Sequence, residues 1–308
     1  MTSYEIAANI FYSTVLVVSV ILNTTACYII LFKVKKKELT HIFIISLSVT
    51  NLLESVIGLI PQIIISSEAK LEKTPLCITG SFAVFGFAVT SITHLSIFSL
   101  VRTVAIKYPI YYFKNSKRFW CRATLILICY CYGFSWAIFP VIGWSKYEID
   151  LDKKRCSLDW RMTRPDSLSY ILSILIFCNF LPGTLIAIGL YISKKVIYRR
   201  RTCKLRKNEN NRSIDLLEKD YLRVCFLSSI LFFAIWTPYA VVGILALSKI
   251  VPPPLLVTTA AMFSKISTIS NVLTNCFINT SFRKHLLNLK IVRVFLNKKI
   301  ESPRIEDV

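Results

Sequence analysis

A lysine near the middle of a long apolar stretch is the residue of this sequence most clearly suited to chemistry. Lys265 lies within residues 254–279, a run long enough to cross a bilayer. An ammonium group at that depth costs roughly 3 kcal/mol on insertion scales. Lys265 is more than ten residues, or at least roughly 15 Å, from either end of the run, which is further than a lysine side chain reaches. A desolvated lysine loses its proton easily and attacks aldehydes to form a Schiff base, so we expect a reactive amine, with an internal salt bridge as the alternative.

One carboxylate could accompany this amine. Glu54 is the only acidic residue within the apolar runs of the chain. It lies about 13 residues after the start of run 41–66, and Lys265 lies about 14 residues before the end of its own run, which is roughly 20 Å of helical rise in each case. The start of the second run and the end of the seventh are expected on the same side of the membrane. The two side chains would therefore lie at similar depth, and Glu54 is a candidate partner of Lys265.

Seven apolar runs must position these residues. Hydrophobic residues make up 54% of the 308-residue chain, and apolar runs above 20 residues are unusual in a water-soluble protein. We therefore predict an all-α membrane protein, a bundle of seven transmembrane helices that occupies residues 1–308 as one domain. The predicted spans are 8–32, 41–66, 77–106, 120–144, 168–196, 221–247 and 254–279.

The basic residues indicate how the bundle is oriented. The net charge is +21, but lysine and arginine gather in short loops and at run ends, which disfavours nucleic acid as a partner. Because they follow the first, fifth and seventh runs, the positive-inside rule predicts a cell-membrane protein with an extracellular amino terminus. The first run is too long for a cleaved signal peptide and is expected to remain as an anchor. Residues 280–295 alternate basic and apolar residues at helical spacing, which predicts an amphipathic helix on inner-leaflet lipids.

Two cysteines are expected on the outer, oxidising side of the membrane. Cys77 opens the third run, and Cys156 lies in the long loop after the fourth. We predict that they form a disulfide, which would pin the loop over the bundle as a lid. Most other cysteines lie in apolar runs, and no cysteine and histidine spacing suggests a metal site.

Further polar residues and prolines interrupt the apolar runs. Asn23, Asn51 and Asn271 lie in the first, second and seventh runs. Polar groups in hydrocarbon must find partners inside the bundle, so we interpret them as contacts between helices, with a role in a conformational switch as the alternative. Pro182 and Pro238 lie in the fifth and sixth runs and are expected to kink them.

The combined pattern resembles the animal opsins, within the rhodopsin-like (class A) family of G-protein-coupled receptors, over nearly the whole chain. The most specific element is Lys265, which lies 29 residues after Trp236 and six before Asn271, where opsins attach retinal. Other matching segments are Arg102 followed by Pro109, GWSKY, CSLDW, WTPY, and the stretch from FSKISTISN to NTSFRK.

The resemblance implies roles for individual residues. Lys265 would bind retinal, either 11-cis or all-trans, as a Schiff base, and Trp236 and Tyr239 would line the chromophore pocket. Arg102 would face a heterotrimeric G protein on the cytoplasmic side, and Glu218 would pair with Arg102 in the resting state. The expected function is a light-sensing receptor, not an enzyme, in which photoisomerisation of retinal moves a helix and activates the G protein.

A buried protonated Schiff base needs a counterion, because desolvation favours the neutral form. Vertebrate visual opsins supply an acid three residues after the cysteine of the third helix, where this chain has Gly80. Two candidates are left, with the lack of any strong counterion as a third alternative. Asp150 lies where many opsins place an acid in the outer lid, and Glu54 is allowed by its depth in the membrane.

The chain also departs from the family pattern. Residues 271–275 read NVLTN where most members have NPxxY, and Arg102 is flanked by Val101 and Thr103 instead of an acid and a tyrosine. Tyr130 stands where the fourth helix usually has tryptophan. These changes affect the activation relay more than the chromophore site.

Three other functions are alternatives. A retinal photoisomerase with weak or no signalling is compatible with the altered motif at 271–275, and a light-independent ligand receptor could keep Lys265 as a salt-bridge partner. A light-driven ion pump of the microbial type also has seven spans and a lysine in the last. It is disfavoured by Arg102, by the pair Cys77 and Cys156, and by the lack of paired carboxylates for a proton relay along the third run.

Overall fold

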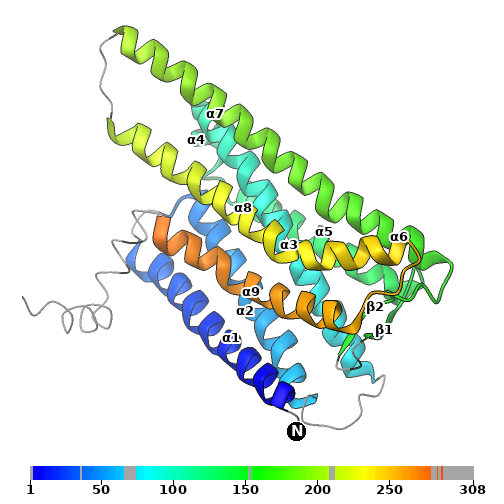
Figure 1. The fold of residues 1–308 in the computed structure, drawn as a ribbon. Coiled ribbons are helices and arrows are strands. Elements are labelled where there is room, and N and C mark those ends of the chain that lie inside the picture. Colours follow the sequence, from blue (N-terminus) through cyan, green and yellow to red (C-terminus); the bar gives the residue numbers. More distant parts are fainter. Residues whose placement is uncertain are drawn as a thin grey trace, which may run out of the picture.

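A computed structural model describes residues 3–34, 37–65, 74–151, 153, 155–207, 212–278, 283 and 286. Figure 1 shows long helices packed side by side in one bundle, with a small hairpin of two strands at one end. We call this end the lid end. The amphipathic helix predicted over 280–295 lies outside the described residues, apart from 283 and 286, and stays a prediction.

Seven long helical rods correspond to the seven predicted spans. The first is α1, which continues into a wide π-helical turn, η1, and the fifth is α6 and α7 joined by a second such turn, η2. A short helix, α4, follows α3. The bounds are Ser3–Tyr28 (α1), Ile29–Lys33 (η1), Leu39–Ile65 (α2), Pro75–Lys107 (α3), Pro109–Asn115 (α4), Phe119–Ile142 (α5), Asp166–Ile174 (α6), Leu175–Phe180 (η2), Leu181–Lys207 (α7), Arg212–Leu247 (α8) and Pro254–Ile278 (α9).

Six of these rods are long and apolar enough to cross a membrane, judged within the described part of the chain. The outer faces of the bundle are correspondingly apolar, since Ile10, Val17, Leu127 and Val141 are each more than half exposed. The seventh rod, α9, is less apolar because it contains Lys265 and several serines and threonines, yet it packs against α1, α2 and α8 as part of the bundle. The predicted seven-helix architecture is confirmed.

Helix α3 is the central element of the bundle and contacts α2, α5, α7 and α8. Its middle is rich in small residues, which let neighbouring backbones approach closely. The crossing with α5 depends on Gly133, because a Cβ there would lie 2.0 Å from the Thr90 hydroxyl oxygen and 2.7 Å from the Gly86 carbonyl oxygen. This crossing of α3 and α5 therefore requires glycine.

Proline and the wide turn η2 shape the fifth rod. Pro182 is the second residue of α7 and has no N–H to donate, so the ordinary helical bond pattern cannot continue through it. The chain accommodates it with η2, in which the Leu181 N–H bonds to the Ile176 carbonyl. In the sixth rod Pro238 lies inside α8, which bends along its length in Figure 1.

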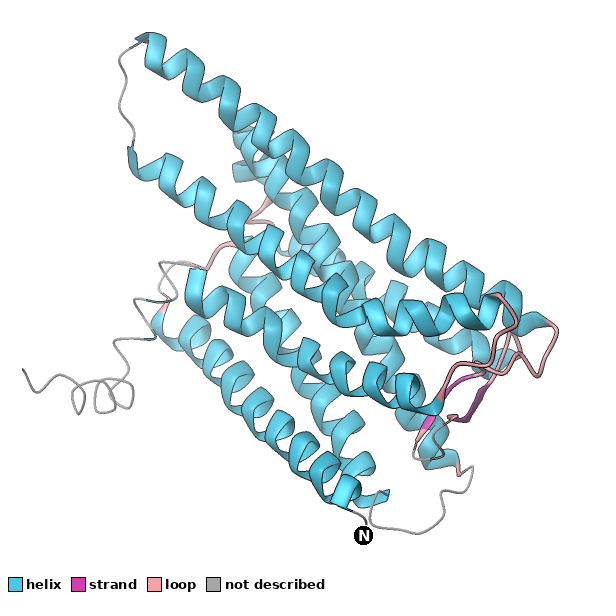
Figure 2. Cartoon of the chain, in the orientation of Figure 1, coloured by secondary structure: helices cyan, strands magenta, loops and turns pink. Residues whose placement is uncertain are grey.

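The long loop between α5 and α6, residues 143–165, contains the hairpin, and we call this loop the lid. Strands β1 (Tyr147–Ile149) and β2 (Cys156–Leu158) pair antiparallel, with Tyr147 opposite Leu158 and Ile149 opposite Cys156. Figure 2 shows both strands beside the ends of the helices. This small sheet was not predicted, and it gives the lid a rigid core.

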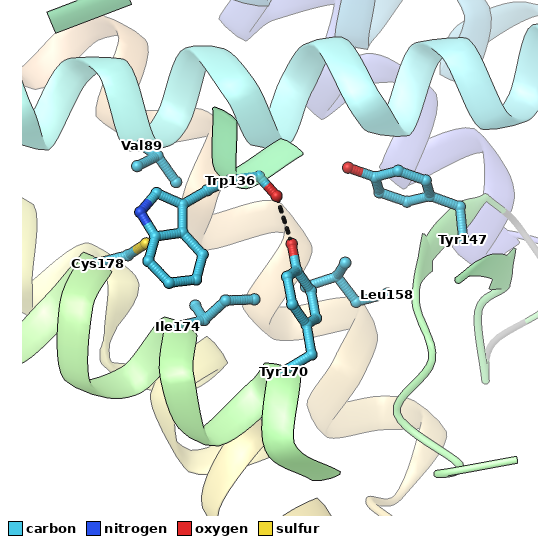
Figure 3. Close-up of a cluster of buried hydrophobic side chains, with 7 residues drawn as sticks. All are labelled: Val89, Trp136, Tyr147, Leu158, Tyr170, Ile174 and Cys178. Carbon is cyan, nitrogen blue, oxygen red and sulfur yellow. Dashed lines mark hydrogen bonds between the residues drawn. The ribbon is translucent and has the colours of Figure 1, made fainter. Parts of the chain in front are cut away.

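A cluster of buried side chains fastens the lid to the bundle (Figure 3). The Tyr147 hydroxyl donates to the Ala137 carbonyl over 2.8 Å, and the Tyr170 hydroxyl donates to the Trp136 carbonyl over 2.7 Å. Burial raises the pKa of the Tyr147 phenol above its ordinary value. The members of the cluster are Val89, Trp136, Tyr147, Leu158, Tyr170, Ile174 and Cys178.

Candidate ligand-binding cavity

The lid is tied covalently to the central helix. Cys77 and Cys156 form a disulfide with their Cα atoms 5.5 Å apart, as predicted from their positions. The Thr74 side chain caps α3 by accepting the N–H of Cys77, which fixes the first turn that carries the sulfur. The Ser81 hydroxyl donates to the Cys156 carbonyl over 2.5 Å. Strand β2 is therefore held in place against the first turns of α3.

Beneath the lid lies a cavity of about 190 Å³. Its walls come from α2, α3, α8 and α9 and from the fifth rod, and its roof comes from the lid. Most of the lining is apolar, and two cationic side chains, Lys265 and Arg155, are among the residues that border it. The lining includes Gly58, Gly80, Arg155, Trp160, Trp236, Tyr239 and Lys265.

Lys265 enters this cavity from α9. Lys265 is 5% exposed and borders the cavity, so its amine faces the interior of the bundle. This position excludes a lysine whose side chain extends along the lipid to the membrane surface. A Cβ on Gly58 of α2 would lie 3.1 Å from the Lys265 Nζ atom and 2.5 Å from a methyl group of Val84. The absence of a side chain at Gly58 therefore lets the amine lie against α2.

Stacked aromatic rings form one wall of the cavity. The ring of Trp236 lies 5.8 Å from Phe232 and 5.7 Å from Tyr239, and both pairs are stacked. Trp160 of the lid continues the row at 6.0 Å from Tyr239. Trp236 and Tyr239 border the cavity, and so does Trp160, which ends the CSLDW segment and received no role from the sequence.

The two candidate acids have different surroundings. Asp150 is buried and pairs with Arg155, with 2.9 Å between the carboxylate oxygen and the Nε atom, and it also accepts the Leu151 N–H over 2.8 Å. Arg155 in turn donates to the Val257 carbonyl of α9 over 2.9 Å. Glu54 is 1% exposed, and its charge and that of Lys265 interact electrostatically. The role of Arg155 could not be predicted from the sequence, because the partner of a charged loop residue depends on how the loop folds.

Two of the three asparagines make polar contacts between helices, at the joint of α1, α2 and α9. The Asn23 amide donates to the Thr268 carbonyl of α9 over 3.0 Å, and the Asn51 amide donates to the Asn23 side-chain oxygen over 3.2 Å. The Thr268 hydroxyl donates to the Lys265 carbonyl over 2.8 Å. Asn271 is buried one turn further along α9. These bonds fix the backbone that carries the amine.

Arg102 lies in α3 at the end of the bundle opposite the lid. It is buried, it donates to the Thr40 hydroxyl of α2, and its guanidinium lies 5.3 Å from the ring centroid of Phe98. Glu218 belongs to α8, but its side chain lies outside the described side chains, so its pairing with Arg102 stays a prediction.

Comparison with known proteins places this arrangement in a family. The family described as 7 transmembrane receptor (rhodopsin family) matches residues 22–279, which includes every helix that borders the cavity. The chain belongs to this family. The match begins inside α1, just before Asn23, and ends just after α9, so it covers the last part of α1 and the helices from α2 to α9.

Individual relatives of the receptor are opsins. It is 27% identical to Opsin-3 of Mus musculus over 83% of this chain and 63% of that protein, and 24% identical to the G0-coupled rhodopsin of Mizuhopecten yessoensis over 91% and 71%. It is 27% identical to the visual pigment-like receptor peropsin of Homo sapiens over 53% and 48%. This chain therefore spans about two thirds of the length of Opsin-3 and about half of the length of peropsin. The fold matches the crystal structure of squid rhodopsin with a TM-score of 0.83 at 20% identity, covering 98% of this chain and 89% of that chain.

Proposed function

We propose that this receptor is a photoreceptor that binds retinal covalently through Lys265. The observation that carries the proposal is a buried primary amine at the edge of a cavity whose wall is a row of stacked aromatic rings. A primary amine is the group that captures an aldehyde, and an apolar aromatic wall suits a polyene. The relatives named as opsins support the same assignment. The proposed orientation has the amino terminus and the lid outside the cell membrane.

The residues present fit this chromophore. Lys265 would hold retinal through a C=N bond between its nitrogen and the aldehyde carbon, and the aldehyde oxygen would leave as water. Retinal supplies light absorption and a light-driven change of shape when it is bound. Trp236, Tyr239 and Trp160 confine the apolar body, and the disulfide-tied lid limits the access of water to the nitrogen.

Helix α8 connects the cavity with the region around Arg102. Trp236 borders the cavity, and Cys225, about 11 residues or roughly 16 Å earlier on the same helix, packs in one cluster with Phe98, over which the Arg102 guanidinium lies. A ligand that changes shape against Trp236 shifts the population of α8 positions, and an outward movement opens a cytoplasmic cleft around Arg102. A heterotrimeric G protein is the proposed partner, since the basic loops favour an acidic surface.

The test uses the purified receptor with 11-cis and all-trans retinal in the dark. We expect at least one isomer to give a pigment that survives acid denaturation and is trapped by borohydride as a secondary amine. Lys265→Ala and Lys265→Arg should give no trapped adduct, because neither side chain supplies a primary amine. Adduct formation in Lys265→Ala, or none in the unaltered chain, would overturn the proposal.

A photoisomerase is a second candidate, and the end of α9 favours it. Residues 271–275 lack the proline and tyrosine of the NPxxY motif, and α9 continues as a helix to Ile278. An altered relay fits a protein that converts all-trans to 11-cis retinal without signalling. Illumination of the pigment in the presence of G proteins separates the two: nucleotide exchange supports the receptor, and repeated isomer turnover without exchange supports the isomerase.

A further inference from the structure

We propose that Glu54 of α2, and not Asp150 of the lid, is the counterion of the positively charged Lys265 nitrogen. This inference rests on the proposed function, because it concerns the nitrogen to which the chromophore is attached. It follows from three features of the described residues: the engagement of Asp150, the position of Glu54 relative to Gly58, and the absence of acids along α3.

Asp150 is already neutralised by its neighbour. One carboxylate oxygen pairs with the Arg155 Nε atom at 2.9 Å, and the other accepts the Leu151 N–H. Arg155, and not Asp150, borders the cavity. Arg155 also interacts electrostatically with Lys265, as a like charge. Seen from the cavity the pair is at best neutral, so it gives the Lys265 nitrogen no net anionic partner.

Glu54 lies one helical turn before Gly58, the residue of α2 that the Lys265 amine approaches. The Lys265 Nζ atom is 3.1 Å from the position of a Cβ on Gly58. Side chains four residues apart on a helix have Cβ atoms about 5–6 Å apart, so the Glu54 carboxylate can reach the same region. Glu54 Oε1 is buried and has no hydrogen-bond partner among the described residues. A buried carboxylate is costly unless paired, and the Lys265 nitrogen is the cation with which it interacts.

Helix α3 offers no competing acid. Residues 75–107 contain neither aspartate nor glutamate, and a Cβ on Gly80 would meet nothing within 4 Å. The position used by vertebrate visual opsins is thus open space beside the cavity. Glu54 is the carboxylate that the helices bring to this depth.

The first test is the absorption spectrum of the pigment. In Glu54→Gln the Lys265 nitrogen should lose its proton to solvent at neutral pH, which moves the visible band to the near ultraviolet, and acid should restore it. The matched control is Glu148→Gln, the same change at a lid acid that pairs with Lys146 and does not border the cavity; it should keep the visible band. The double variant Asp150→Asn/Arg155→Gln removes the lid pair together and should also keep it.

The second test needs no pigment and covers the case in which Glu54→Gln fails to bind retinal. A thermal double-mutant cycle on the ligand-free receptor compares Glu54→Gln, Lys265→Met and the double variant. We expect each single variant to lower the melting temperature, and the double variant to lose less than the sum of the two, because it leaves no buried charge alone.

The outcomes separate the two proposals. A visible pigment in Glu54→Gln, or an ultraviolet pigment in Asp150→Asn/Arg155→Gln, overturns the assignment of Glu54 while retinal binding stands. Additive losses in the thermal cycle also overturn it, since they mean that the two side chains do not interact. If the unaltered chain forms no borohydride-trapped adduct, the proposed function itself fails.

Discussion

The ion pair in the lid should make a large contribution to stability that depends on both partners. Replacing Asp150 with asparagine removes the carboxylate and leaves the Arg155 side chain, which is 12% exposed, without its 2.9 Å partner. Breaking a buried pair by removing one member typically costs about 3–5 kcal/mol. Because 1 kcal/mol shifts the melting temperature of a large domain by about 2–4 °C, we expect Asp150→Asn to melt roughly 10 °C below the unaltered receptor.

The assay is thermal unfolding of the ligand-free receptor in detergent. The comparison is the double variant Asp150→Asn/Arg155→Gln, which removes both charges and should recover most of the loss, since a neutral pair costs less than one stranded charge. Glu148→Gln, whose pair with Lys146 is partly exposed, should change the melting temperature by no more than about 2 °C. If Asp150→Asn has the same melting temperature as the unaltered receptor, or if the double variant melts at as low a temperature as Asp150→Asn, then the ion pair does not stabilise the lid.

Three further predictions concern the lid and the amine. Cys77→Ser with Cys156→Ser opens a cross-link between residues 79 apart and should lower the free energy of unfolding by up to about 4.5 kcal/mol, measured by thermal unfolding with and without reductant. Gly58→Ala would place a methyl group 2.5 Å from Val84, costing about 1–3 kcal/mol and slowing adduct formation; Val84→Ala in that background should restore stability. Burial raises the pKa of Tyr147 above its value in the unfolded chain, so the stabilisation by the neutral phenol is present below about pH 10 and is lost as the pH rises further. In a series of melting temperatures measured at different pH values, Tyr147→Phe should show a smaller loss of stability at alkaline pH.

The bundle itself could be predicted from the sequence because its physical cause is local. A run of apolar residues crosses the membrane whatever its neighbours are, so the helices follow from composition and length. The Cys77–Cys156 disulfide followed from the side of the membrane on which each cysteine lies. The inward position of Lys265 followed from its distance to both ends of its run.

The lid and the charges around the amine depend on contacts between distant segments. Nothing in the local sequence states that Asp150 would pair with Arg155, or that the segment between them would turn back as a hairpin. The role of Gly58 likewise becomes visible only when α9 is placed beside α2. For this reason the sequence left Asp150 and Glu54 as alternatives, and our proposal of Glu54 depends on the pairing of Arg155 with Asp150.

The joint formed by Asn23, Asn51 and Thr268 has a mechanical consequence for any molecule tethered to Lys265. The backbone beside the amine is bonded to Asn23 of α1, which Asn51 joins to α2, so the backbone end of the tether is held in place. When such a ligand changes length or curvature, we expect a larger displacement at its free end than at its anchored end. A change of shape in the ligand therefore acts mainly on the side chains at the far side of the cavity, and the anchored end determines the direction in which the ligand moves.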